Sequence, residues 1–468
     1  MSELPGTHAA PAAEFPTRRI ERWKTILGLA WPLIVANSFW NLQMTIDRLF
    51  LADYSTEAMG AAVAVMGVFW TPMALLQQTA AYVTTFVAQY FGAGRNNMIG
   101  PAVWQSLWVS IFGGLLFLLL IPAAAVIFGG MGHAASMQRL ESDYFIAMCF
   151  SALPTAIVAA TSGYFTGLGR TQVIMQINGV GLVANAVLDY CMILGKFGFP
   201  KMGIAGAGYA TAIGTVIAAL YGLTLVFKDK ERREYNLTSG WKWDADLLKR
   251  FIRFGVPSGM QWALEGLAFS IFLIFIGRMV DGSAALSASS IVVTVMMLSI
   301  LPAMGVAQST SVLVGQYLGE KRPQDAESAV WSGWQVTLIY ILIIGLTFVL
   351  FPGFYAGWFR NNEDAAMWLK VSQMIPLLLI FVAIFTTSDS MNMVFAFSLK
   401  GAGDTKFVTI VALLLPWPLM VLPAYLFREQ PGAVYWAWGA GTVYSMVQAV
   451  IFWRRFVGGK WKKMSVIN

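Results

Sequence analysis

The sequence has few charged residues and almost no cysteine. Charged side chains make up 12% of the 468 residues, whereas about 25% is usual in soluble proteins. Apolar residues reach 57%, which is more than a soluble fold of this size hides from water. The two cysteines, Cys149 and Cys191, both lie in apolar stretches, and this excludes a disulfide-stapled scaffold. These deficits predict a polytopic membrane protein.

Motifs of hydrolases and ATP-driven machines are also missing. The sequence contains no H-E-x-x-H zinc motif, no Walker A loop and no paired-aspartate prenyl-binding motif. Residues 401–404 read GAGD, which matches the G-x-G-D of intramembrane aspartyl proteases, but no second catalytic aspartate accompanies it. We therefore expect that the protein is not an enzyme and carries no cofactor.

Apolar runs long enough for a spanning helix occupy almost the whole chain. We expect an all-α polytopic membrane protein with twelve transmembrane helices, near residues 26–50, 60–88, 102–128, 143–167, 173–195, 204–227, 250–276, 284–314, 331–352, 371–397, 406–427 and 435–456. The expected organisation is a disordered tail (1–23), a six-helix lobe (24–228), a cytoplasmic linker (229–249), a second six-helix lobe (250–456) and a basic tail (457–468).

Two short patterns occur once in each half of the chain. FVAQYFGAGR (86–95) matches LVGQYLGEKR (313–322) at an offset of 227 positions. FTGLGRT (165–171) matches LKGAGDT (399–405) at an offset of 234. The same order and nearly the same spacing indicate two pseudo-symmetric parallel repeats around a central cavity, the arrangement in which secondary transporters place their binding site.

The excess of basic residues, a net charge of +7, is a topology signal. Lysine and arginine concentrate in residues 18–24, 228–253 and 454–463, which the positive-inside rule places in the cytoplasm. We expect both termini on the cytoplasmic side of the inner (plasma) membrane. We also expect anionic lipid, and not nucleic acid, as the partner of these charges.

Four carboxyl groups fall deep inside the expected helices: Asp47, Asp189, Glu265 and Asp389. A carboxylate at the centre of a spanning helix costs at least about 2.5 kcal/mol, so it needs a partner, a water-filled cavity or a proton. Basic residues are nearly absent from the same segments. For one residue alone, a hydrogen bond to a neighbouring helix is the alternative; four together predict a cavity that binds cations, protons or both.

Polar and aromatic neighbours share the faces of these carboxyl groups. An amide precedes three of the four acids by four residues, which places it on the same helix face, and tryptophans precede two of them by one or two turns. The tryptophans either pack or stack against flat cationic ligands. The side chains expected to line the cavity are Trp40, Gln43, Gln261, Trp262, Phe385 and Asn392.

Over residues 24–456 the chain resembles the multidrug and toxic compound extrusion (MATE) family. The matching segments are WPLIVANSFWNLQMTID (31–47), VAQYFGAGR (87–95), VANAVLD (183–189), GIAGAGYATAIGT (203–215), GVPSGMQWALE (255–265) and SDSMNMVFAFSLKGAGDT (388–405). The last two are similar to the seventh and tenth helices of the NorM-type branch.

The resemblance implies a site and an activity. It implies that Asp47, Asn185, Asp189 and Thr211 bind a cation or proton in the first lobe, and that Glu265 and Asp389 do so in the second. Phe385 stands where NorM-type members usually carry a tyrosine, so the second site departs from the family pattern.

The implied activity is antiport by a monomer. Amphipathic organic cations would leave in exchange for entering Na⁺ or H⁺, by alternating access of the two lobes. The alternative is a flippase for lipid-linked oligosaccharides or other lipids. Flippases of that kind line their cavity with basic residues, whereas this chain buries acids.

Overall fold

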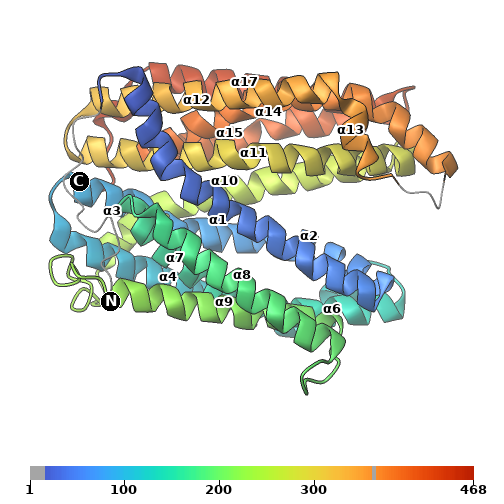
Figure 1. The fold of residues 1–468 in the computed structure, drawn as a ribbon, viewed down its shortest axis with the longest axis horizontal. Coiled ribbons are helices and arrows are strands. Elements are labelled where there is room, and N and C mark those ends of the chain that lie inside the picture. Colours follow the sequence, from blue (N-terminus) through green and yellow to red (C-terminus); the bar gives the residue numbers. More distant parts are fainter. Residues whose placement is uncertain (1–15, 361–364) are drawn as a thin grey trace.

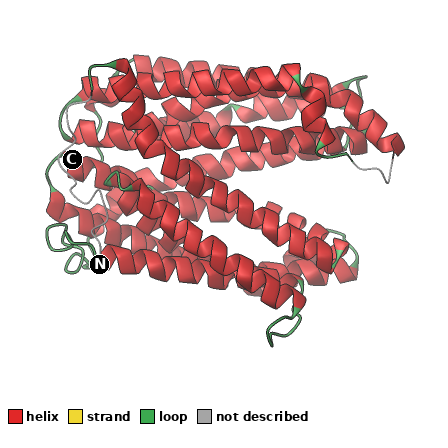
Figure 2. Cartoon of the chain, viewed as in Figure 1, coloured by secondary structure: helices red, strands yellow, loops and turns green. Residues whose placement is uncertain are grey.

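The computed structural model describes residues 16–360 and 365–468, and within these ranges the chain is helical with no strand (Figure 2). Residues 1–15, most of the expected N-terminal tail, lie outside the described part. The expected all-α polytopic fold is confirmed.

The helices of the first half pack into one bundle, drawn blue to green in Figure 1. They are α1 (Arg19–Tyr54), α2 (Thr56–Ala81), α3 (Val83–Gly92), α4 (Ile99–Leu118), α5 (Ala124–Gly129), α6 (Ala135–Cys149), α7 (Ala152–Gly167), α8 (Thr171–Leu194) and α9 (Ile204–Phe227), with short 3-10 turns η1 (Asn96–Met98) and η2 (Ile121–Ala123).

The helices of the second half form the other bundle, drawn yellow-green to red in Figure 1. They are α10 (Ala245–Gly277), α11 (Gly282–Gly319), α12 (Pro323–Leu350), α13 (Pro352–Gly357), α14 (Ala365–Ala402), α15 (Thr405–Leu414), the π-helical turn η3 (Trp417–Val421), α16 (Leu422–Leu426), α17 (Ala433–Val457) and the 3-10 turn η4 (Lys460–Lys463).

Each of the twelve expected spans coincides with a helical pass. Ten passes in the described residues are long and apolar enough to cross a membrane, or eleven if α6 and α7, which meet at a 41° bend, count as one. The twelfth expected span is α17, whose last turn carries Arg454 and Arg455. The number and order of the passes therefore follow from the apolar runs alone.

The ends of the helices differ from the expected boundaries. α1 begins at Arg19, so residues 19–23 of the expected tail are helical. α10 begins at Ala245, inside the expected linker, because the Asp244 side chain accepts the Leu247 N–H at 2.9 Å and caps the helix. Residues 460–463 form a helical turn in place of a free tail.

The two bundles meet along α1, α2 and α3 on one side and α10 and α11 on the other. The C-terminus, the turns that follow α3 and α11, and the connection between α9 and α10 lie at one end of the molecule (Figure 1). We call this end the basic face, because it carries Arg95, Lys321 and residues 228–233. The bundle ribbons lie close together there and diverge toward the opposite end (Figure 1).

Candidate functional site

Three helices of the first bundle bring the expected cation-binding residues of that lobe together. Asp47 on α1 interacts with Asp189 and Asn185 on α8. The Asn185 amide donates to the Thr211 hydroxyl on α9 at 3.4 Å. Asp189 is fully buried and Asp47 is 9% exposed. The four residues, far apart in sequence, therefore form one cluster inside the bundle.

A glycine on α9 allows this approach. A methyl group built on Gly214 would lie 3.0 Å from the backbone and side-chain carbon atoms of Asn185. α8 and α9 can therefore pack closely at this level, as small residues permit in membrane helices. The close packing places Asn185 within reach of Thr211.

The cluster holds more acceptor oxygens than donors. One oxygen of Asp47, the amide oxygen of Asn185 and both oxygens of Asp189 are buried without a hydrogen-bond partner in the described chain. A small cavity of about 20 Å³, lined partly by Asp47 and Tyr144, adjoins them, and that is room for about one water molecule. Buried acceptors of this kind are costly unless they are satisfied, so the cluster suits a bound proton or a small cation.

The second bundle holds its carboxyl groups in a chain of amides. The Gln448 amide on α17 donates to Glu265 at 3.0 Å, and Gln261 donates to the same oxygen at 3.4 Å. The Asn392 amide lies 3.2 Å from the Gln448 side-chain oxygen and 3.5 Å from Asp389. Glu265 and Asp389 are thus linked through two amide side chains, Gln448 of α17 and Asn392 of α14, while Gln261 of α10 adds a second donor to Glu265.

Sequence reasoning missed the residues that α17 contributes. Gln448 joins the two acids, and Tyr444, one turn earlier, interacts electrostatically with both. Phe385 is buried in an apolar cluster, and its carbonyl accepts the Ser445 hydroxyl at 3.3 Å. A phenol therefore interacts with both acids from α17, while position 385 of α14 carries a phenylalanine; no spacing along the sequence indicates this arrangement.

Lys400 corrects the expectation that basic partners are absent. The sequence places it in a cytoplasmic loop, but α14 continues to Ala402 and Lys400 is 5% exposed. Its ammonium group lies 4.1 Å from the ring centre of Phe397 and 5.9 Å from that of Trp262. It interacts electrostatically with Glu265, yet none of the ion pairs found in the described ranges includes it.

The remaining expected cavity residues lie near the contact between the bundles. Trp40 is 44% exposed and packs against Trp70 with the ring centres 5.1 Å apart. A methyl group on Gly266, the neighbour of Glu265, would lie 3.9 Å from the Trp70 ring. Gln43 is partly exposed, one turn before Asp47. Trp70, which sequence reasoning did not single out, therefore lies between Trp40 of α1 and the part of α10 that carries Gly266.

Ion pairs anchor the connection between the bundles at the basic face. Arg170 pairs with Asp229 at 2.8 Å and also with Glu231, and the Tyr164 hydroxyl donates to Asp229 at 2.8 Å. Burial, followed by the nearby Glu231 carboxylate, raises the pKa of the Tyr235 hydroxyl above its ordinary value, so this group is a neutral phenol. The start of the connection is therefore a fixed structure.

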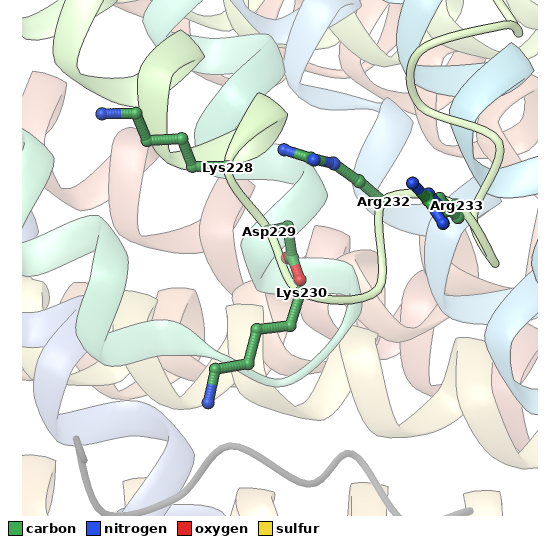
Figure 3. A pocket seen from close by; sticks show the side chains of 5 residues that line it. All are labelled: Lys228, Asp229, Lys230, Arg232 and Arg233. Carbon is green, nitrogen blue, oxygen red and sulfur yellow. The ribbon is translucent and has the colours of Figure 1, made fainter.

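Four cations surround a hollow on this anchored connection. It measures about 390 Å³ and is lined by Lys228, Lys230, Arg232 and Arg233 together with Asp229. Figure 3 shows their side chains projecting from one turn of the chain, with Asp229 between the two lysines. Because Asp229 pairs with Arg170, the hollow keeps a strong positive charge.

The MatE family model matches residues 32–191 and 257–426 of this chain. The probable multidrug resistance protein NorM of Thermotoga maritima is 27% identical over 98% of this chain and 96% of its own length. The protein of the same name from Xanthomonas campestris pv. campestris is 27% identical over 88% of each chain.

Solved structures share the fold. A multidrug resistance MATE transporter of the MOP superfamily in an outward-facing conformation superposes with a TM-score of 0.85 at 21% identity, over 95% of this chain and 97% of that one. A MOP-superfamily transporter from Pyrococcus furiosus gives the same score, identity and coverage.

Proposed function

The chain belongs to the MatE family, and from this we propose that it is a secondary active antiporter that exports amphipathic organic cations in exchange for Na⁺ or H⁺. The observation that carries the proposal is the pair of buried carboxyl groups, Asp47 and Asp189, which no base in the described residues neutralises by an ion pair. The relatives named as multidrug resistance proteins support the same class of cargo.

The coupling step follows from the excess of acceptors. In the proposed cycle a proton or Na⁺ enters from the face opposite the basic face and binds the Asp47–Asp189 cluster. Binding satisfies the buried oxygens and removes negative charge that a cationic cargo needs nearby. The cargo then leaves, and the two bundles rock to expose the site to the basic face, where the ion departs.

The second bundle offers a site for the cargo. Glu265 and Asp389 supply negative charge, and Trp262, Trp40 and Trp70 supply aromatic faces on which a flat cation stacks. A flippase for lipid-linked oligosaccharides is the alternative, but a pyrophosphate group requires a basic cavity. Lys400 is a single base that acts on one of the two acids, Glu265, so one base faces two acids in this bundle, which favours a cationic cargo.

Dye efflux from proteoliposomes tests the antiport. Purified protein is reconstituted with a fluorescent organic cation inside, and inward Na⁺ and H⁺ gradients are imposed separately. We expect efflux under one gradient, none without a gradient, and efflux lowered by about tenfold or more for Asp47→Asn under either gradient. Equal efflux with and without gradients would contradict antiport, and movement of a lipid-linked sugar in place of the dye would favour the flippase.

We also propose an orientation and a lipid partner: a monomer in the plasma (inner) membrane with the basic face in the cytoplasm, where the hollow at residues 228–233 binds anionic lipid headgroups. Its charge matches the negative surface of the cytoplasmic leaflet. Reconstitution with and without phosphatidylglycerol tests the partner. We expect phosphatidylglycerol to raise the melting temperature of the wild type and to have little effect on a K230Q/R232Q/R233Q variant; equal shifts in both would contradict the site.

A further inference from the structure

Two buried glutamines reach across the boundary between the bundles in a reciprocal manner. The Gln89 amide on α3 donates to the Gly401 carbonyl of the second bundle at 3.0 Å. The Gln316 amide on α11 donates to the Gly167 carbonyl of the first bundle at 2.9 Å. Both glutamines are nearly inaccessible to solvent. Gln89 and Gln316 are equivalent positions of one repeated pattern, and Gly167 and Gly401 are equivalent positions of the other. Each glutamine therefore binds the glycine that the opposite bundle contributes.

The backbones touch at the same level. A methyl group on Gly92 would lie 2.0 Å from the Gln316 carbonyl oxygen, and one on Gly319 would lie 2.4 Å from that of Gln89. No side chain fits at either position without moving the helices apart. The repeated patterns therefore conserve, within this one chain, a tight junction of α3 with α11 at the basic face.

Further bonds between the bundles lie along the same seam. The Tyr82 hydroxyl donates to the Lys400 carbonyl at 2.8 Å, and the Asn37 amide donates to the Gln308 side chain at 3.3 Å. Near Glu265, where a methyl group built on Gly266 would lie 3.9 Å from the Trp70 ring, none of the hydrogen bonds found in the described residues joins α2 to α10. The hydrogen bonding between the bundles that the structure describes is thus concentrated toward the basic face.

The end of the chain closes over Gln89. The Gln89 side-chain oxygen accepts the Val466 N–H at 2.9 Å and the Ser465 hydroxyl at 3.2 Å. Val466 and Ile467 are buried in an apolar cluster with Phe86 of α3. One glutamine side chain therefore joins α3, the end of α14 and the C-terminal segment.

The same segment is attached to the second bundle a few residues earlier. Trp461 is 1% exposed and stacks on Phe456 of α17, with the ring centres 4.9 Å apart and the planes at 12°. Between Trp461 and Val466 the chain passes from the apolar cluster of the second bundle to that of the first. Residues 461–467 are thus a strap that lies across both bundles.

We propose that Gln89 and Gln316 are the positioning residues that hold the basic face closed, and that the strap of residues 461–467 must leave Gln89 before this face opens. The proposal rests on the alternating access of the proposed function, because only a transporter needs this face to open. The strap makes the Gln89 side of the junction stronger than the Gln316 side. Among the described residues, no chain end lies over Gln316 as the strap lies over Gln89.

Distances between spin labels at the basic face test the proposal. Asn97 and Gln324 are exposed, lie near this face in different bundles, and accept labels in a C149A/C191A background. In the wild type we expect one short distance. In Q89L/Q316L, which loses both hydrogen bonds across the boundary, and separately in a chain that ends at Met464, we expect the fraction of longer distances to rise by about fivefold or more, since the loss of even one buried hydrogen bond has about that effect.

Gln105→Leu is the matched control. Gln105 is as buried as Gln89, but it lies 3.4 Å from the carbonyls of Pro101 and Lys242 and bonds nothing in the second bundle. We expect Q105L to lower the melting temperature without changing the label distances. Gln89→Glu keeps an acceptor for Val466 N–H and loses the donor for Gly401, so it is expected to give an intermediate open fraction.

The outcomes separate the inference from the proposed function. Unchanged distances in both Q89L/Q316L and the shortened chain would overturn the junction and the strap, even if dye efflux is normal. Longer distances with no efflux in the wild type would support the junction and contradict the antiport. If Q89L/Q316L does not fold, the shortened chain decides, because it leaves every spanning helix intact.

Discussion

The carboxyl group of Asp47 on α1 lies against that of Asp189 on α8, and both oxygens of Asp189 are buried without a hydrogen-bond partner in the described residues. Two carboxylates in contact repel one another in a medium of low dielectric constant. In the proposed antiport, a proton or cation held between the two acids relieves this repulsion, and its occupancy would follow the ion gradients.

Replacing either acid by asparagine removes the coupling site without removing a bond on which the fold depends. We expect Asp47→Asn and Asp189→Asn to lower gradient-driven dye efflux by about tenfold or more, equivalent to at least about 1.4 kcal/mol of lost ion binding. Expression and melting temperature should be unchanged or higher. Asp53→Asn is the control, since Asp53 is exposed on the same helix; normal efflux by Asp47→Asn would refute the assignment.

Gln448 is expected to hold the acids of the second bundle. Its amide donates to Glu265, and its oxygen lies 3.2 Å from the Asn392 amide. Gln448→Leu leaves the buried Asn392 amide and the partly buried Glu265 carboxyl less satisfied, which costs about 1–3 kcal/mol of folding free energy and should raise the dye concentration for half-maximal efflux. Met446→Leu, an exposed position of α17, serves as control. Equal stability of the two variants in chemical unfolding would contradict the role of Gln448.

The sequence predicted the helical passes and the four acids within them, of which Asp47 and Asp189 are buried and Glu265 and Asp389 partly buried, because both features have a strong physical signature. Apolar runs define the spans, and a carboxylate inside such a run is conspicuous since the bilayer disfavours it. Lys400 was misplaced for a related reason. The apolar run ends near residue 397 while α14 continues to Ala402, and helix ends past the apolar run leave little signal in hydropathy.

Contacts between distant helices were beyond sequence reasoning. Gln448 and Trp70 sit in apolar helices with no acid close by in sequence, so nothing marks their neighbours in space. The repeats around Gln89 and Gln316 were visible, but a repeat shows only that two positions are equivalent. Each glutamine binds the opposite bundle because of how the two halves face one another. The spacing of the repeats along the chain carries no information about that orientation.

The close packing of α8 against α9 predicts that Gly214 is sensitive to substitution by a larger residue. A methyl group at Gly214 would come within 3.0 Å of Asn185, so Gly214→Ala should push α9 from α8 and lengthen the bond from Asn185 to Thr211. We expect about 1–3 kcal/mol of destabilisation and a higher ion concentration for half-maximal efflux. Gly67→Ala is matched, since its methyl group meets no atom within 4 Å. A Gly214→Ala protein with normal ion dependence would show that the helices adjust freely.

Lys400 is expected to weaken the hold of the second bundle on cationic cargo. Its charge is buried between Phe397 and Trp262 and acts on Glu265, so it repels a cation that approaches the same carboxylate. Lys400→Met keeps the length and the apolar contacts of the side chain and removes the charge. We expect the dye concentration for half-maximal efflux to fall by about threefold or more for monovalent cations, with a smaller change for zwitterionic dyes.

Lys400→Arg separates the charge from the shape of the side chain. It retains the positive charge and a planar group that stacks on aromatic rings, so its half-maximal dye concentration should stay near that of the wild type. A fall in Lys400→Arg as large as in Lys400→Met would show that packing, and not charge, sets the affinity. If Lys400→Met leaves the affinity for monovalent cations unchanged, Glu265 does not bind the cargo in the conformation that takes up cargo. The buried charge of Lys400 acts on Glu265, so its removal would otherwise change that affinity.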